Sequence, residues 1–217
     1  VSLTRQTIRV TSVRSRLLEP GYGYIRLSTF QADTGSDFQK HVQQLQKQSG
    51  GQLKGLVLDL RSNPGGLLTA AVQVADDLLE KGNIVSTRGR ISISDARFDA
   101  TPGDLLKGAP VVVLADAGSA SASEVLAGAL RDNCAAALAG RPSFGKGKIQ
   151  AVFGLADDSG LIVTVANYLT PAGTAIQGVG LTPEAGLRGP GLGLLEPPLP
   201  SAAQFDDAWD HRVCATK

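Results

Sequence analysis

The sequence predicts an α/β fold in which parallel strands alternate with helices. Two nearly continuous apolar runs, at 53–61 and 109–118, have the composition of strands buried on both faces of a parallel sheet. Each run is followed by a turn of small residues and then by a helix-like segment, at 67–82 and at 119–133. Units of this kind pair their strands in parallel and place the helices on the faces of the sheet.

The other segments fit the same alternation. Residues 21–30 alternate apolar and polar positions, which indicates a strand. Residues 36–48 have helical spacing, and Ser36 is the expected N-cap. Further strands are expected at 83–98 (one strand or a hairpin), 135–140, 148–155 and 160–170, the last two joined by the turn ADDSG.

Composition is that of an ordinary globular protein and excludes several classes of function. The chain has 217 residues, of which 42% are hydrophobic and 19% charged, enough to bury a core. The 21 Lys and Arg residues nearly balance the 20 Asp and Glu residues, so no nucleic-acid surface is expected. No apolar run is long enough for a transmembrane helix. The opening VSLTRQTIRV is interpreted as a cut inside a longer precursor.

The two cysteines, Cys134 and Cys214, match neither a zinc site nor a disulfide scaffold. They are either separate thiols or one bridge that ties the tail to the body. The two histidines are His41, expected in solvent on a helix, and His211. Neither lies near a plausible nucleophile turn in the sequence, so a Ser-His-Asp triad is not favoured.

The stretch GRPSFGKGK, at 140–148, offers three interpretations of Lys146. A phosphate-binding loop would need a hydroxyl residue after the lysine and then a helix, but Gly147 and a strand-like segment follow. An S-x-x-K site with Ser143 would need both side chains on one helical turn, which the flanking glycines disfavour. The third interpretation pairs Lys146 with a distant serine.

That serine is expected in AGSASASEVLAGAL, where a buried strand gives way to a helix. A serine there feels the positive end of the helix dipole, and the next amide can face a developing oxyanion. Lysine can act as its base only when neutral, and Phe144 is a candidate apolar wall around Lys146. The alternative is purely structural: Ser121 and Glu124 form a capping box, or Ser119 is the cap.

Five segments carry motifs that can be compared with known families: EPGYGYIRLSTF, LVLDLRSNPGGLLTAAVQVAD, GSASASEVLAGAL, GRPSFGKGKIQ and YLTPAGTAIQGVGLTPE. Together they resemble the C-terminal processing peptidases, also called tail-specific proteases. They occur in the family's order and at compatible spacing, over roughly residues 19–184. The resemblance implies an α/β fold of the Clp peptidase and crotonase type, a spiral of β-β-α units.

The resemblance also assigns roles in a Ser-Lys peptidase. Ser121 is the implied nucleophile, Lys146 its base, and Gln150 the third member that orients the lysine. No metal or other cofactor is implied. The implied reaction is endopeptidase cleavage at or near the C-terminal tail of a protein, through an acyl-enzyme.

The implied oxyanion hole consists of backbone amides. One belongs to Ala122, directly after the nucleophile, and the other to Gly65 or Gly66 of the NPGG turn. Gly66 is favoured, but the sequence does not separate the two glycines. A glycine amide can approach a substrate carbonyl with no side chain in the way.

Residues 1–12 are interpreted as the last strand of a PDZ domain and the return to the core, 13–186 as the Ser-Lys protease core, and 187–217 as a Pro/Gly-rich linker and tail. The implied substrates are proteins or peptides with apolar C-termini, and the implied compartment is the bacterial periplasm rather than a plastid lumen. An adaptor protein and a homo-oligomer are left open. The alternatives are a non-catalytic ligand- or partner-binding module on the same fold, and an acyl-thioester enzyme of the crotonase group.

Overall fold

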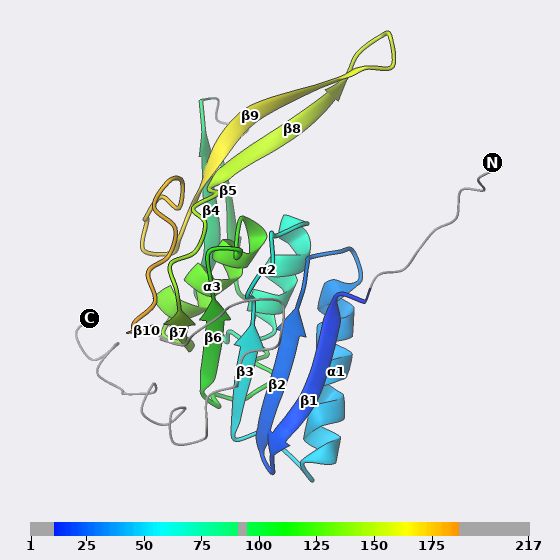
Figure 1. Cartoon of the computed structure of the whole chain (residues 1–217), viewed down its shortest axis with the longest axis vertical. Helices are drawn as coiled ribbons and strands as arrows, with labels where there is room; N and C mark the ends of the chain where they lie inside the picture. The colour runs from blue at the N-terminus through cyan, green and yellow to red at the C-terminus, as the bar shows by residue number, and fades with distance from the viewer. Residues whose placement is uncertain (1–10, 91–94, 187–217) are drawn as a thin grey trace, which may run out of the picture.

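The computed structural model describes residues 11–90 and 95–186 and contains two sheets (Figure 1). The larger sheet consists of β1 (Val13–Glu19), β2 (Tyr22–Leu27), β3 (Gly55–Asp59), β6 (Val111–Ala115), β7 (Ala136–Gly140) and β10 (Ala185–Gly186), in the order β1-β2-β3-β6-β7-β10. Strands β2, β3, β6, β7 and β10 run parallel, while β1 is antiparallel to β2.

The second sheet has the order β5-β4-β9-β8 and is antiparallel throughout. It consists of β4 (Asn83–Gly89), β5 (Ala96–Asp99), β8 (Lys148–Gly154) and β9 (Gly160–Leu169). The far half of the β8–β9 hairpin projects from the body of the molecule (Figure 1). Segment 83–98 is therefore a hairpin, the second of the two forms expected from its sequence.

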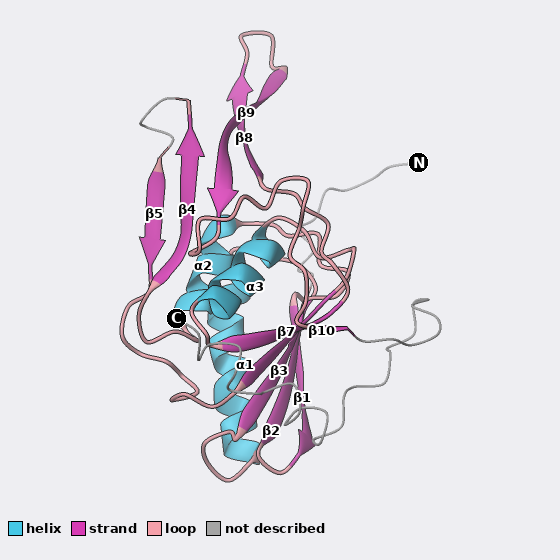
Figure 2. Cartoon of the chain, turned by 90° about the vertical axis from the view of Figure 1, so that its left-hand side faces the viewer, coloured by secondary structure: helices cyan, strands magenta, loops and turns pink. Residues whose placement is uncertain are grey.

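Three helices complete the described part: α1 (Thr34–Gln48), α2 (Leu68–Asp76) and α3 (Ala122–Asp132). Figure 2 shows α2 and α3 between the two sheets. Every residue of α3 from Ala122 to Leu130 is buried, because the helix packs on β7 on one side and on β4 on the other. Small alanine side chains allow both contacts. Within the described ranges, none of these helices has the length and hydropathy needed to cross a bilayer.

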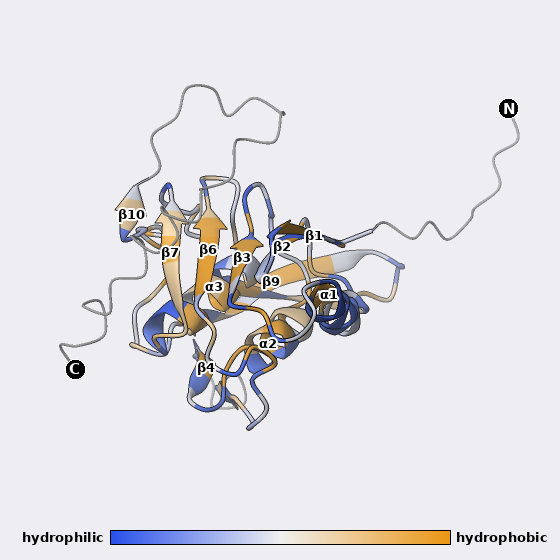
Figure 3. Ribbon diagram, turned by 90° about the horizontal axis from the view of Figure 1, so that it is seen from below, coloured by the Kyte–Doolittle hydropathy of each residue, from blue (hydrophilic) through white to orange (hydrophobic). Residues whose placement is uncertain are grey.

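Strands β3 and β6 are buried along their whole length, as their apolar runs predict, and stand out as hydrophobic in Figure 3. Their side chains alternate between two clusters. Leu56, Leu58 and Val113 join the large core under the helices. Val57 and Val112 join a smaller cluster with Tyr24 on the opposite face of the sheet. Burial on both faces is the reason that no polar alternation is visible in these two segments.

The structure corrects several expected boundaries. Helix α1 begins at Thr34 with Asp33 as N-cap, and the Ser36 hydroxyl instead donates to the Asp33 carbonyl, at 2.9 Å. Helix α2 ends at Asp76, well before residue 82, because turn hydrogen bonds replace the helical ones over the next residues. Strands β1 and β10 have no counterpart among the expected elements, and β10 is only two residues long.

His41 does not lie free in solvent as expected. Its Nδ1 is 2.6 Å from the Ser15 hydroxyl of β1, so the ring helps to join α1 to the edge of the sheet. Cys134 is not a free thiol. His211, Cys214, the tail at 187–217 and most of segment 1–12 lie outside the described residues.

Asp77, which caps the C-terminus of α2, carries a carboxyl group with an unusual environment. Oδ1 accepts a hydrogen bond from Gln39 at 2.7 Å, whereas Oδ2 is buried without a partner among the described residues. Burial, with a smaller contribution from the charge of Asp76, raises the pKa of Asp77 from 3.8 to about 6. The folded state therefore holds this proton more tightly than the unfolded chain, and the resulting stabilisation is lost as the pH rises through about 6.

We expect Asp77→Asn to stabilise the protein at pH 8, where the wild-type carboxylate is charged, and to give little gain at pH 4. Allowing for the partial exposure of the group, the gain at pH 8 is about 1 kcal/mol, or roughly 2–4 °C in Tm. Thermal unfolding followed by circular dichroism at both pH values measures it. An equal gain at pH 4 and pH 8 would show that the charge of Asp77 is not the cause.

Candidate active site

The predicted site residues come from loops at one edge of the larger sheet. Strands β3, β6 and β7 are adjacent and parallel, so their carboxyl ends lie together. The loops that follow them contain the NPGG turn, the SASAS turn and the GKG segment, respectively. Ligands of open α/β sheets bind at this edge, so the topology brings three distant motifs into one place.

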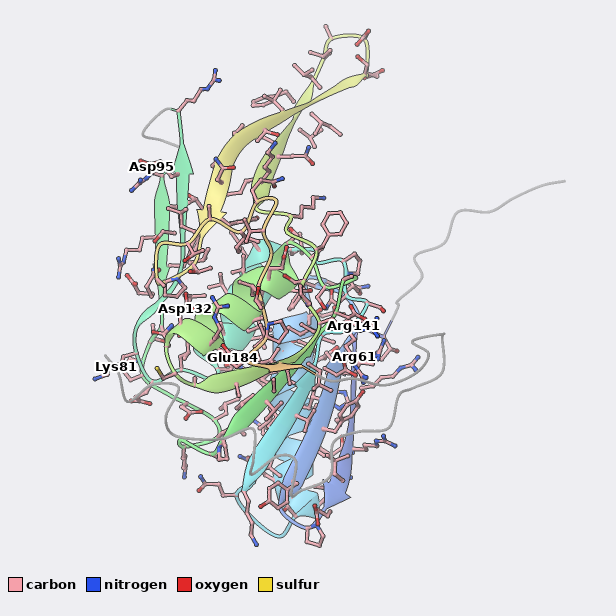
Figure 4. All side chains as sticks on the ribbon, turned by 60° about the vertical axis from the view of Figure 1, so that its left-hand side comes forward. Arg61, Lys81, Asp95, Asp132, Arg141 and Glu184 are labelled. Atoms are coloured by element: carbon pink, nitrogen blue, oxygen red, sulfur yellow. The ribbon has the colours of Figure 1, made fainter. Side chains whose placement is uncertain are left out.

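A buried ion pair holds the end of β3. Asp59 is fully buried and accepts hydrogen bonds from the Arg61 side chain, one of them 2.8 Å from Nε, and from the Tyr24 hydroxyl at 2.7 Å. Burial alone would raise the pKa of Asp59, but the hydrogen bonds and charge of Arg61 hold it below its usual range. Arg61 stands at the end of the sheet where the NPGG turn begins (Figure 4).

Asn63 fastens the NPGG turn to the loop after β6. It is fully buried; its Nδ2 donates to the Leu27 carbonyl and its Oδ1 accepts from the Gly65 amide, both at 2.9 Å. Its carbonyl accepts from the Ala120 amide at 3.0 Å and from the Ser123 hydroxyl at 2.9 Å. The glycine turn and the serine turn are therefore held together by one asparagine, which the sequence analysis did not single out.

The two glycines of this turn differ in their hydrogen bonds. Gly65 has φ of 102°, and a Cβ there would lie 2.9 Å from the Ser121 Cβ, so only glycine fits against the serine turn. The Gly65 amide is committed to Asn63. Gly66 lies opposite Phe30 in a bridge whose hydrogen bonds are made by its neighbours Gly65 and Leu67, and its own amide donates to none of the described residues.

The three serines of SASAS are in different environments. Ser119 is 2% exposed, and its hydroxyl donates to the Leu60 carbonyl at 2.8 Å. Ser123 is fully buried and donates to Asn63. Ser121 is partly exposed, and its hydroxyl donates to none of the described residues. Only the middle serine thus keeps its hydroxyl proton available.

Ser121 is also distinguished by its backbone. It is the N-cap of α3, with φ of 57° and ψ of −115°, outside the regions that non-glycine residues favour. Strained residues of this kind persist where surrounding contacts hold them, and they cluster at functional sites. The next residue, Ala122, begins the helix, so its amide is one of those without an intrahelical acceptor.

The GKG segment is a loop, not a helix, and β8 follows it directly. This excludes the helical S-x-x-K geometry and the helix that a phosphate-binding loop requires. The expected apolar wall is not formed among the described residues, since Phe144 is 66% exposed and Lys146 is itself exposed. Gln150 lies on β8, as expected, and is exposed. No hydrogen bond among the described residues joins the side chains of Ser121, Lys146 and Gln150.

Glu124, expected only as half of a capping box, has a larger role. It is 1% exposed, and its Oε2 accepts from the backbone amides of Ser121 and Lys146, at 2.8 Å each. The Glu124 carboxylate is therefore close to the Lys146 backbone, although 22 positions separate the two residues in the sequence. Ser143, the disfavoured S-x-x-K partner of Lys146, is buried and donates to the same carboxylate. No local sequence pattern signals these contacts across 22 and 19 residues.

Comparison with known proteins agrees with this architecture. The model of peptidase family S41 matches residues 21–186. A carboxy-terminal-processing protease of Bartonella bacilliformis is 46% identical over 201 residues, covering 92% of this chain and 44% of that protein. A chloroplastic carboxyl-terminal-processing peptidase of Arabidopsis thaliana is 42% identical over 192 residues, covering 85% of this chain and 37% of that protein.

Among solved structures, the photosystem II D1 C-terminal processing protease superposes with a TM-score of 0.73 at 40% identity, covering 85% of this chain and 50% of that one. The tricorn protease shares the fold alone, with a TM-score of 0.51 at 14% identity. The chain thus spans half or less of the length of the processing proteases it resembles.

These observations define a mixed α/β domain of the Clp peptidase and crotonase type, as found in the catalytic domains of these proteases. The chain belongs to peptidase family S41, the family of the carboxyl-terminal processing proteases.

Proposed function

We propose that this chain is the catalytic core of a serine endopeptidase that cleaves proteins at or near their C-terminal tails, with Ser121 as nucleophile, Lys146 as base and Gln150 as the residue that orients the lysine. The observation that carries the proposal is the difference among the three serines of SASAS. The hydroxyls of Ser119 and Ser123 donate to backbone carbonyls. Ser121 is partly exposed at the start of a helix, and its hydroxyl donates a hydrogen bond to none of the described residues.

In the proposed reaction, the Ser121 oxygen attacks the scissile carbonyl carbon while neutral Lys146 takes the hydroxyl proton. The tetrahedral intermediate collapses as the protonated lysine gives this proton to the leaving amine, and the peptide C–N bond breaks. Water then attacks the resulting serine ester, with its proton passing to neutral Lys146. The second tetrahedral intermediate collapses as the C–O bond to Ser121 breaks and the protonated lysine returns this proton to the serine oxygen, which releases the acid product and restores the enzyme. No cofactor takes part in these steps.

We propose that the amides of Ala122 and Gly66 form the oxyanion hole. Both amides donate to none of the described residues, and Asn63 joins the NPGG turn, which contains Gly66, to the serine turn next to Ala122. The Gly65 amide already donates to Asn63, which argues for Gly66 as the second donor. Each donor in such a hole contributes about 10²–10³-fold to kcat.

For the whole protein we propose substrates with apolar C-terminal tails, a PDZ domain preceding this core, and residence in the bacterial periplasm. The names of the relatives support C-terminal processing, and relatives occur in a bacterium and in chloroplasts. A plastid lumen is the alternative compartment. Recruitment by an adaptor and assembly into a homo-oligomer are compatible with this proposal and are not required by it.

The test uses the complete protein as the cell makes it, with an unfolded protein that ends in apolar residues. We expect mass spectrometry to find fragments cut near the C-terminus, and acid quenching during turnover to trap a substrate fragment esterified to Ser121. Binding of the substrate without any cleavage would contradict the proposal and support the non-catalytic module. Hydrolysis of acyl thioesters in place of peptides would support the crotonase-type alternative.

A further inference from the structure

The carboxylate of Glu124 is buried between the serine turn and the GKG loop. Glu124 is the third residue of α3, and its side chain is 1% exposed. Four donors surround its two oxygens: the amides of Ser121, Gly145 and Lys146, and the hydroxyl of Ser143. A carboxylate has enough acceptor sites for all four donors, two at each oxygen.

One oxygen of this carboxylate joins the two residues with the central proposed roles. Oε2 accepts from the Ser121 amide and from the Lys146 amide, at 2.8 Å in each case. The two backbone nitrogens therefore cannot be farther apart than the sum of these two distances. Glu124 thus sets how close the backbones of the proposed nucleophile and the proposed base lie, although 25 positions separate them in the sequence.

The other oxygen fixes the loop that carries the lysine. Oε1 accepts from the Ser143 hydroxyl at 2.5 Å and from the Gly145 amide at 2.7 Å. Ser143 in turn accepts from the Leu181 amide at 2.7 Å, so its own proton is directed at Glu124. Gly145 has φ of 87°, and no helix or strand includes it. Glu124 is the contact that ties this irregular backbone to α3.

We propose that Glu124 is a positioning residue of the Ser-Lys site, which holds the Lys146 backbone against the Ser121 turn and stabilises the unusual backbone of Ser121. This inference rests on the proposed peptidase function. Glu124 acts through Ser121 and Lys146 and does not itself touch substrate.

The network is specific for a carboxylate. Because all four partners are donors, glutamine can satisfy only the two that face its oxygen. Its NH₂ group would face either the amides of Ser121 and Lys146 or the two donors at Oε1. In the first orientation the NH₂ group opposes two backbone amides. In the second it opposes the Gly145 amide, and the Ser143 hydroxyl must turn its proton away to accept from it, so at least one buried amide loses its acceptor in either case.

The test compares Glu124→Gln with wild type in the complete protein, using a fluorogenic peptide with an apolar tail. We expect kcat to fall about 10- to 100-fold, because small displacements of catalytic groups are this costly, while KM stays within about threefold. Assays run well below the Tm of each variant, measured by circular dichroism, so that unfolded enzyme does not contribute to the loss.

Glu80→Gln is the matched control. In wild type, the Glu80 carboxylate also accepts hydrogen bonds from two backbone amides of a loop, those of Gly103 and Asp104, at 3.1 and 3.3 Å. This loop contributes no proposed site residue. We expect its kcat and KM to equal those of wild type. An equal fall in kcat for both variants would overturn the specific role of Glu124.

Ser143→Ala removes one of the four donors without removing the charge, and it tests the inference even where Glu124→Gln does not fold. We expect a kcat loss of several-fold at unchanged KM. In the double variant that combines Glu124→Gln with Ser143→Ala, we expect a kcat loss smaller than the product of the two single losses, because both act on the same network. Wild-type kcat in both Glu124→Gln and Ser143→Ala would overturn the inference while the peptidase function stands. Inactive wild-type enzyme would instead count against the proposed function itself.

Discussion

Replacing Ser121 with alanine is expected to reduce peptide cleavage to the background rate, a loss of roughly 10⁴–10⁶ in kcat, as for nucleophiles of other serine peptidases. The reason is that no other hydroxyl in the SASAS turn can substitute. Ser119 and Ser123 are buried and donate to the carbonyls of Leu60 and Asn63. Cleavage of the apolar-tailed substrate, followed by mass spectrometry, measures the loss.

The protein itself should remain folded in this variant. Alanine keeps the Cβ that packs against Gly65, and the Ser121 amide that donates to Glu124 belongs to the backbone. Ser36→Ala is a matched control, since it removes a hydroxyl from the exposed start of α1. Cleavage by Ser121→Ala at the wild-type rate would rule out Ser121 as nucleophile.

Replacing Lys146 with alanine is expected to lower kcat by about 10³–10⁴, because Ser121 then lacks a base, while substrate binding is largely kept. Lys146→Arg should be as inactive as Lys146→Ala, because a guanidinium does not lose its proton in proteins. A purely electrostatic role for the positive charge predicts the opposite, namely that arginine restores activity. Steady-state kinetics on the three proteins separates these cases.

Lys148→Ala provides the control for Lys146. Lys148 is two residues further on, exposed, and at the start of β8, and no role is proposed for it. We expect wild-type kinetics, which would show that loss of a positive charge close to Lys146 is not enough to inactivate the enzyme. Equal losses in Lys146→Ala and Lys148→Ala would contradict the assignment of Lys146 as base.

The elements that could be predicted from the sequence are those with a strong local pattern. The apolar runs of β3 and β6, and the alternation of β2, identify strands regardless of what surrounds them. The predicted start of α1 was wrong by two residues. The helix begins at Thr34, whose buried hydroxyl lies 2.8 Å from the Ser12 hydroxyl, and the local pattern does not signal this tertiary contact. The two-residue strand β10 exists only through its pairing with β7 and has no pattern of its own.

The motifs identified the family, and the residue types in them indicated the chemistry. The local pattern around GRPSFGKGK also excluded two of its three interpretations, since glycine and a strand follow Lys146. The expectation of an apolar wall from Phe144 was wrong for the described residues, because the direction of a loop side chain depends on the fold around it.

By itself, then, the sequence determined the fold class, the family and the segments in which the proposed site residues lie, because these follow from local periodicity and from motifs contiguous in the chain. Only the tertiary structure decided which serine keeps a free hydroxyl proton, which glycine amide is already occupied, and that Glu124 joins Ser121 to Lys146. Those properties are set by hydrogen bonds between residues that are distant in the sequence, and such bonds exist only once parallel strands bring their carboxyl ends to one edge of the sheet.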